Sequence, residues 1–311
     1  MDGRWRTAAR VLVCTLIVAP AGCSDAGPQA PEPEPLTQRQ WADLAYADSS
    51  AAQRLDLYLP ETGEGPFPLV LRVHGGGWRG GSKALSPGSH YLRVRERGYA
   101  LASVGYRLSS EAVFPAQIHD LKTALRWLRA NASTYRLDPA RVAAWGSSAG
   151  GHLVALLGTS GGIGALEGTS FGSAGESSRV QAVVDWFGPS DFLLFNAHLS
   201  AQGCAGDVNR PGSSVFQLLG AAVEDRPDLA TLASPRTYVT MDDPPFLIQQ
   251  GTRDCTVPRQ QSETLRDELV DVLGAGAAEL DLLDAGHGGA AFSAAPNVDR
   301  ILNFLEGVLG G

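Results

Sequence analysis

The strongest constraint on the fold is a series of short apolar runs, each as long as a β-strand and each ending at a loop rich in Gly, Pro or Asp. The runs are Leu69–Val73, Ala100–Val104, Val142–Trp145, Val180–Phe187, Phe246–Gln249 and Leu280–Leu283. Helix-like segments lie between and after them, at Ala116–Ala130, Gly151–Leu157, Gln260–Leu273 and Asn297–Val308. Near-continuous apolar strands that alternate with helices predict an α/β fold, with a mostly parallel central sheet and helices on both faces.

One further run has a different pattern. Leu55–Leu59 alternates strictly between leucine and a more polar residue, which predicts an exposed antiparallel strand at the edge of the sheet. In open sheets of this kind, functional sites form beyond the carboxyl ends of the parallel strands. The loops that follow the apolar runs are therefore where candidate functional residues are sought.

The bulk composition limits the class of partner. The chain has 311 residues, of which 44% are hydrophobic and 19% charged, so it can bury a sizeable core. Its formal net charge of −8 argues against a nucleic-acid partner, because phosphate binding needs a basic surface. No sequence feature predicts an oligomeric state.

The first residues have the composition of an export signal. Arg4, Arg6 and Arg10 precede an apolar run, Val11–Pro20, which is short for a membrane span and is followed by small residues. We therefore expect residues 1–22 to be a signal peptide and the mature protein to leave the cytoplasm.

Two processing sites compete in this segment. Ala19-Pro20-Ala21 fits the small-x-small pattern of ordinary signal peptidase, whereas Ala21-Gly22-Cys23-Ser24 resembles the bacterial lipoprotein box. In the second case Cys23 would carry a lipid that attaches the protein to a membrane. The expected location is accordingly the cell envelope through a lipid anchor, or the secreted fraction.

The segment that follows differs in composition from the rest of the chain. Residues 23–40 contain four prolines interleaved with glutamate, which predicts an extended tether, and residues 41–311 read as one catalytic domain. Two cysteines remain in that domain, Cys204 and Cys255. Outside the cytoplasm they would form a disulfide, and the alternative is a pair of buried thiols.

The candidate nucleophile is Ser148. It is the central residue of Gly146-Ser147-Ser148-Ala149-Gly150, which joins the predicted strand Val142–Trp145 to the predicted helix that begins at Gly151. A Gly-x-Ser-x-Gly sequence in this context forms a tight turn that exposes the serine hydroxyl at the start of a helix. Ser147 is off the apex of that turn.

The candidate general base is His287. It lies in Asp284-Ala285-Gly286-His287-Gly288-Gly289, directly after the predicted strand Leu280–Leu283, and its small neighbours leave the imidazole free to reach the serine. The other histidines fit this role less well. His152 is expected to point away from the site, His74 to order its own loop, and His90, His119 and His198 to occupy surface or helix positions.

The candidate acid is Asp254, in the loop after Phe246–Gln249. The order Ser148, Asp254, His287 is the order that a strand–serine–helix hydrolase requires, and the carboxylate would hold the imidazole tautomer. Rival carboxylates are Asp281 and Asp284, which are close to His287 in sequence, and Asp191 and Asp243, which are better placed to shape turns.

A candidate oxyanion hole follows Leu69–Val73. The sequence His74-Gly75-Gly76-Gly77-Trp78 places three glycines at a strand end, where bare amides can approach an oxygen closely together with the amide of Ala149. A phosphate-binding loop would need a following Gly-Lys-Ser/Thr, which is absent. Trp78 would either wall the cleft or only pack against its surroundings.

Four segments carry a resemblance to a known family. They are His74–Lys83, Trp145–His152, Gly251–Pro258 and Ala285–Gly288. Together they resemble α/β-hydrolase carboxylesterases, in particular the hormone-sensitive-lipase-like enzymes and the related bacterial feruloyl and acetyl-xylan esterases. The resemblance runs from about Arg54 to the C-terminus.

The resemblance implies an α/β-hydrolase fold with a small cap region, which Asp185–Asp191 enters. It implies Ser148, Asp254 and His287 as the catalytic residues and Gly76, Gly77 and Ala149 as the oxyanion donors. It also implies a Cys204–Cys255 pairing beside the acidic residue. Trp78 and Val257 are the candidate substrate-lining residues. The Gly/Ser-rich stretch Gly161–Ser178 lies outside the resemblance and either gates the cleft or has no role.

These features predict a serine carboxylesterase that works through an acyl-enzyme and needs no metal ion or organic cofactor. By family analogy, the expected substrates are short-chain or aryl esters, free or linked to plant polysaccharides as acetyl or feruloyl groups. The alternatives are an amidase or peptidase of the same fold and a non-catalytic binding protein.

Overall fold

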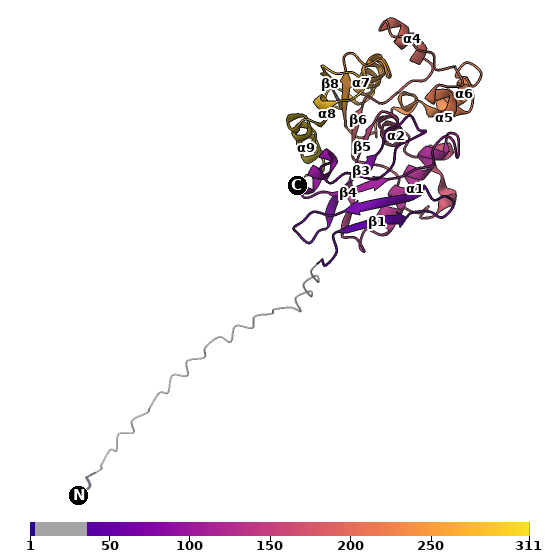
Figure 1. Ribbon diagram of the computed structural model, residues 1–311. Coiled ribbons are helices and arrows are strands. Elements are labelled where there is room, and N and C mark those ends of the chain that lie inside the picture. The colour runs from indigo at the N-terminus through magenta and orange to yellow at the C-terminus, as the bar shows by residue number, and fades with distance from the viewer. Residues whose placement is uncertain (4–35, 311) are drawn as a thin grey trace. The chain divides into compact units, whose positions relative to one another are not determined.

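The computed structural model describes residues 1–3 and 36–310, and in this part of the chain eight strands form one sheet in the order β1-β2-β4-β3-β5-β6-β7-β8 (Figure 1). The strands are β1 (Gln40–Ala45), β2 (Arg54–Tyr58), β3 (Phe67–Val73), β4 (Ala100–Val104), β5 (Leu137–Ser147), β6 (Ala182–Trp186), β7 (Phe246–Gly251) and β8 (Ala278–Leu283). β2 pairs antiparallel with β1 and β4, and every other neighbouring pair is parallel. The predicted mostly parallel sheet is confirmed.

Helices cover both faces of this sheet (Figure 1). The longer ones are α1 (Ala116–Ala130), α2 (Ala149–Thr159), α7 (Gln260–Leu273) and α9 (Ala295–Leu309), together with the 3-10 helix η1 (His90–Arg97). Alternate strand residues separate into two apolar clusters, because successive side chains point to opposite faces of a strand. Leu69 and Leu71 pack with α1, α2 and α7, whereas Val70 packs with η1 and α9.

The prediction of an exposed edge strand at Leu55–Leu59 is wrong. β2 is antiparallel as expected, but β1 pairs along its outer side, so β2 lies inside the sheet. Leu55 and Leu57 are fully buried. The polar residue in the alternation, Asp56, is also buried, and it is satisfied by the ammonium of Lys83 at 2.6 Å and the amide of Asp43 at 2.8 Å.

The folded unit begins earlier than the predicted boundary at residue 41. Gln40 is the first residue of β1, and Leu36 packs against the core. The guanidinium of Arg39 donates to the carbonyl of Pro60 at 2.8 Å. The predicted signal segment, the lipidation site Cys23 and most of the predicted tether lie outside the described residues.

A helical insertion between β6 and β7 forms the expected cap. It contains α4 (Phe195–Ala201), α5 (Ser214–Leu219), α6 (Pro227–Ala233) and the 3-10 helix η3 (Pro235–Tyr238). These helices gather at one end of the sheet (Figure 1). None of the helices in the described ranges is long and apolar enough to cross a lipid bilayer.

The Gly/Ser-rich stretch Gly161–Ser178 packs against α1. It contains the short helices α3 (Gly164–Glu167) and η2 (Thr169–Phe171). Glu167 accepts from the ammonium of Lys122 at 2.8 Å, and its backbone carbonyl accepts from Arg126 at the same distance. This anchoring ties the stretch to the side of the domain.

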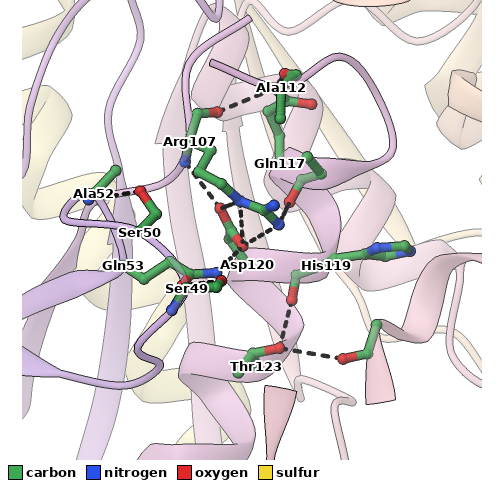
Figure 2. Close-up of polar contacts among 12 residues, drawn as sticks. Ser49, Ser50, Ala52, Gln53, Arg107, Ala112, Gln117, His119, Asp120 and Thr123 are labelled. Atoms are coloured by element: carbon green, nitrogen blue, oxygen red, sulfur yellow. Dashed lines mark hydrogen bonds and ion pairs between the residues drawn. The ribbon is translucent and has the colours of Figure 1, made fainter. Parts of the chain in front are cut away.

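A buried polar network joins the start of β2, the loop after β4 and helix α1 (Figure 2). The carboxylate of Asp120 is fully buried and accepts from Gln53 at 2.7 Å and from the guanidinium of Arg107 at 2.7 Å. The backbone amide of Arg107 also donates to Asp120 at 2.9 Å. Because Gln53 and Arg107 both donate to this one carboxylate of α1, the network fixes the segments before β2 and after β4 relative to α1.

Candidate active site

Ser148 occupies the turn between β5 and α2. Its backbone has φ 56° and ψ −120°, a positive-φ conformation that a non-glycine residue adopts only where the surrounding structure imposes it. The structure leaves no room for side chains beside it. A Cβ on Gly146 would overlap the carbonyl of Gly150, and a Cβ on Gly150 would overlap that of Val73. Glycine at both ends of the pentapeptide is therefore a steric requirement of the turn.

His287 lies in the loop after β8, and its Nε2 is 2.8 Å from Oγ of Ser148. The Phe187 ring packs edge-on against the imidazole with a centroid distance of 4.7 Å. Phe187 itself is held near the serine, because the preceding residue, Trp186, accepts a 2.8 Å hydrogen bond from the Ser148 amide. Packing and hydrogen bonding thus orient the imidazole toward the hydroxyl.

Asp254 lies on the far side of the imidazole, in the loop after β7. Its Oδ2 is 2.7 Å from Nδ1 of His287, and its side chain is fully buried. The same carboxylate accepts from the amides of Thr256 at 2.8 Å and Val257 at 3.0 Å, and from the Gln250 side chain at 3.1 Å. These donors stabilise a buried negative charge where the imidazole needs one.

The rival carboxylates lie elsewhere. Asp284 forms an ion pair with Arg253, and Asp281 accepts from Gln249 at 2.9 Å. Asp191 pairs with Arg236 at 3.0 Å, and Asp243 caps the local turn at Thr240.

A disulfide joins the Asp254 loop to the cap. Cys204, just after α4, is bonded to Cys255 with a Cα–Cα distance of 5.3 Å. Nearby, the Gln202 side chain donates to the carbonyl of Asp254 at 2.5 Å and accepts from the amide of Arg259 at 2.9 Å. The backbone of the acidic residue is thereby fixed to the cap helix on one side and to α7 on the other.

The glycine loop after β3 runs beside the serine. Gly76 has φ 112° and Gly77 φ 60°, and a Cβ on Gly76 would overlap the carbonyl of Gly80. Neither glycine amide donates a hydrogen bond to another described residue. The amide of Ala149 is at the first position of α2, where a helix has no internal acceptor for its N–H groups. These amides are free to bind an oxygen atom.

Trp78 anchors the glycine loop. Only 2% of this residue is exposed, and its indole N–H donates to Nδ1 of His152 at 3.2 Å. His152 in turn bonds the carbonyl of Ala233 through Nε2 at 2.7 Å. Burial lowers the pKa of His152 to about 4, so the ring is neutral and serves as a structural link. Trp78 reaches the cleft wall, but its contacts are chiefly those of a packed residue.

A cavity of about 370 Å³ opens over these groups. Its lining includes Gly76, Gly77, Ser148 and His287, and the predicted residues Trp78 and Val257 are also part of it. No residue of Gly161–Ser178 lines it, so that stretch does not border the cleft. This volume suits a small ligand or the end of a larger one.

The cap contributes cavity-lining residues that no sequence motif marks. Phe195 of α4 and Ser214 and Val215 of α5 line the cavity, and the Ser214 side chain lies next to Gly77 of the glycine loop. Each stands alone in an ordinary amphipathic segment, with no motif around it. Only the folding of the cap over the sheet brings them to the site.

A second carboxyl group lies behind the serine turn. Asp185 of β6 is fully buried; its Oδ1 accepts from the Gly188 amide at 2.9 Å, and its Oδ2 has no partner among the described residues. Burial raises the pKa of Asp185 to about 7. A Cβ on Gly151 would overlap Oδ1, so this carboxyl also requires a glycine at the start of α2.

The site thus contains a hydroxyl, an imidazole and a carboxylate in one hydrogen-bonded series, next to free backbone amides. In the described residues, no group of three or more His, Cys, Asp or Glu side chains is arranged to hold a metal ion. The arrangement can deprotonate the hydroxyl and stabilise an oxyanion beside it.

The sheet order, the strand–serine–helix turn and the chain order of the three residues define the α/β-hydrolase fold. Within that class, residues 55–269 match the model of the BD-FAE family. The chain belongs to the BD-FAE family.

Two solved structures are similar to this chain at 30% identity, both with a TM-score of 0.80. One is described as a truncated form of a carbohydrate esterase from gut microbiota, and the match covers 88% of this chain and 97% of that one. The other is a bifunctional GH43-CE protein of Bacteroides eggerthii, of which the match covers 36%.

Two curated relatives come from Mycobacterium tuberculosis. Esterase LipQ is 32% identical over 91% of this chain, and Esterase LipC is 31% identical over 79%. The matches span 66% of LipQ and 59% of LipC, so this chain corresponds to about two thirds or less of those relatives.

Proposed function

We propose that this protein is a serine carboxylesterase that hydrolyses esters through an acyl-enzyme at Ser148. The observation that carries the proposal is the series Ser148 Oγ, His287 Nε2 and Asp254 Oδ2, with contacts of 2.8 and 2.7 Å. Ser148 and His287 line a cavity together with Gly76 and Gly77, whose backbone amides are free to bind an oxygen atom. The names of the similar proteins, which are esterases, support the same activity.

In the proposed reaction, His287 accepts the proton of Ser148 as the hydroxyl oxygen attacks the ester carbonyl. The amides of Gly76, Gly77 and Ala149 bind the oxyanion, and buried Asp254 stabilises the imidazolium. His287 then protonates the leaving alcohol, and the acyl group remains on the serine. A water molecule deprotonated by His287 attacks the acyl-enzyme and releases the acid.

Substitution of the serine tests this assignment. We expect Ser148→Ala to abolish p-nitrophenyl acetate hydrolysis and labelling by a fluorophosphonate probe, with an unchanged thermal unfolding curve. Ser86→Ala, which changes an exposed loop serine, is the matched control and should retain both. Unchanged turnover in the Ser148 variant would overturn the proposal.

A comparison of matched ester and amide substrates separates an esterase from an amidase or peptidase. We expect faster turnover of the ester in each pair, and faster amide turnover would reassign the reaction. A folded protein that hydrolyses neither and resists the probe would be a binding protein on a hydrolase fold.

The proposed substrate class is short-chain or aryl esters, including acetyl or feruloyl groups on plant polysaccharides. The cavity of about 370 Å³ is compatible with a small acyl group, and one similar structure is described as a carbohydrate esterase. An acyl-chain-length series, tested beside acetylated xylan and methyl ferulate, would rank these substrates. A preference for long acyl chains would contradict this choice.

The proposed location is outside the cytoplasm, in the secreted fraction or attached to the envelope through a lipid on Cys23. A disulfide between Cys204 and Cys255 is compatible with an oxidising compartment. Membrane fractionation of the full-length protein and its Cys23→Ala variant would distinguish the two routes. Release of the variant alone supports the lipid, and equal release of both supports ordinary secretion.

A further inference from the structure

Arg79 carries the one permanent charge among the described residues that line the cleft. The lining contains no aspartate, glutamate or lysine, and its other ionisable side chain is His287. The protein as a whole has a formal net charge of −8. A cation at this position is therefore contrary to the overall charge of the molecule.

The backbone of Arg79 is fixed next to the glycine loop. The amides of Arg79 and Gly80 both donate to the carbonyl of Gly76, at 3.2 and 3.1 Å. The preceding residue, Trp78, is buried and bonded to His152. This turn holds the start of the arginine side chain at a constant position relative to Gly76.

The guanidinium lies between that loop and the cap. Its Nε would be 3.7 Å from a Cβ placed on Gly77, so the side chain extends beside the glycine whose amide is a proposed oxyanion donor. Its Nη1 donates to the carbonyl of Gly212 at 3.2 Å, in the loop before α5. The charge is therefore on an exposed part of the cleft lining, beside Gly77 and outside the hydrogen-bonded series of Ser148, His287 and Asp254.

Most N–H groups of the Arg79 guanidinium are not used in hydrogen bonds to the described residues. Arg79 forms no ion pair with a carboxylate in the described part of the chain, and the bond to Gly212 uses one of its five N–H groups. A planar guanidinium binds a carboxylate through two parallel hydrogen bonds, which is a geometry that lysine cannot offer.

We propose that Arg79 binds a carboxylate carried by the substrate, so that the protein prefers esters with a negative charge a few bonds from the scissile carbonyl. This inference rests on the proposed esterase function. The carboxylate can belong to the acyl half or to the alcohol half of the ester. A test therefore needs one arm for each half.

Each arm compares a carboxylate ester with its neutral amide of the same shape. The acyl arm uses monomethyl adipate and the methyl ester of adipic acid monoamide. The alcohol arm uses 5-acetoxypentanoate and 5-acetoxypentanamide. The measurement is kcat/KM by pH-stat titration for the wild type, Arg79→Gln and Arg79→Lys, at low salt and in 0.5 M NaCl.

We expect the wild type to prefer the anionic ester by about 5- to 10-fold in one arm, which is the size of a partly exposed charge-assisted contact. Arg79→Gln should remove that preference and leave the neutral ester unaffected. Arg79→Lys should retain part of it, and salt should weaken it. Arg54→Gln is the matched control, since Arg54 is exposed, donates to one carbonyl at 3.0 Å and lies outside the cleft.

Three outcomes would overturn the inference. In the first, the ratio of kcat/KM for the anionic ester to kcat/KM for its neutral amide is the same in the wild type and in Arg79→Gln in both arms, which shows that Arg79 does not recognise charge on the substrate. In the second, Arg79→Gln lowers kcat/KM by the same factor for the anionic ester and for its neutral amide, which shows that the charge of Arg79 assists every ester alike. A wild type that hydrolyses p-nitrophenyl acetate but none of the four esters overturns this inference alone, whereas a wild type that hydrolyses neither p-nitrophenyl acetate nor the four esters overturns the proposed function as well.

Discussion

Nδ1 of His287 lies 2.7 Å from Oδ2 of Asp254, a carboxylate whose side chain has no exposed surface. The aspartate accepts three further hydrogen bonds, so its position is set by the protein and not by the histidine alone. A buried carboxylate with this support selects the tautomer that leaves Nε2 free to accept the proton of Ser148.

Asp254→Asn tests that relationship. The amide keeps the shape of the side chain but can donate to Nδ1, which favours the wrong tautomer and removes the negative charge. We expect kcat to fall by about 10³- to 10⁴-fold, with a fold retained by circular dichroism. A loss of less than tenfold would mean that another carboxylate supports the histidine.

Gly76→Ala tests the oxyanion loop. Its φ of 112° is unfavourable for alanine, and the added Cβ would overlap the carbonyl of Gly80. The amide should therefore move, and we expect kcat to fall by about 100-fold or more with a smaller change in KM. Gly88→Ala, at an exposed glycine with open space around its Cα, is the control and should retain activity.

Removal of the Cys204–Cys255 disulfide tests the connection between the cap and the acidic loop. The bridge joins residues 51 apart in sequence, and we expect Cys204→Ser/Cys255→Ser to lower the free energy of unfolding by about 2 to 4 kcal/mol. The kcat should fall less than in Asp254→Asn, because the donors to the carboxylate remain. Urea unfolding at equal protein concentration measures the first effect, and an unchanged midpoint would contradict it.

Asp185 predicts a pH dependence of stability. Burial raises its pKa from 3.8 to about 7, so between these values the folded protein holds a proton that the unfolded chain has lost. The stabilising contribution of this group to the free energy of unfolding is therefore full at low pH and decreases as the pH rises from 3.8 to about 7. Above that pH the free energy of unfolding no longer changes through this group.

Asp185→Asn isolates this contribution, because the buried histidines titrate in both proteins and cancel in the difference. The wild-type free energy of unfolding, measured relative to the variant by urea titration, should decrease by about 4 kcal/mol between pH 4 and pH 8. A difference that does not vary with pH would mean that Asp185 titrates normally.

The local sequence was sufficient to predict the serine turn and the loops that carry the other two candidate catalytic residues. The glycines around Ser148 are required because a Cβ on Gly146 or Gly150 would overlap backbone carbonyls. The five-residue motif is therefore enough to predict the turn. Asp254 and His287 both follow strand ends, and the structure brings them together with Ser148, since the carboxyl ends of parallel strands meet at one edge of a sheet.

Other features depended on contacts between distant segments. The alternation at Leu55–Leu59 fits an edge strand equally well as an inner one, and only the pairing with β1 and the ion pair between Asp56 and Lys83 bury it. Phe195 and Ser214 line the cleft because the cap folds over the sheet, which no local pattern records.

The sequence by itself therefore determined the fold class and singled out Ser148, Asp254 and His287 as the candidate catalytic residues, because steric limits and strand order act within short segments. Only the tertiary structure decided what surrounds them: the donors to Asp254, the cap wall of the cavity and the guanidinium of Arg79 beside Gly77. Those features arise from packing between elements far apart in the chain, where many side chains satisfy the same local pattern.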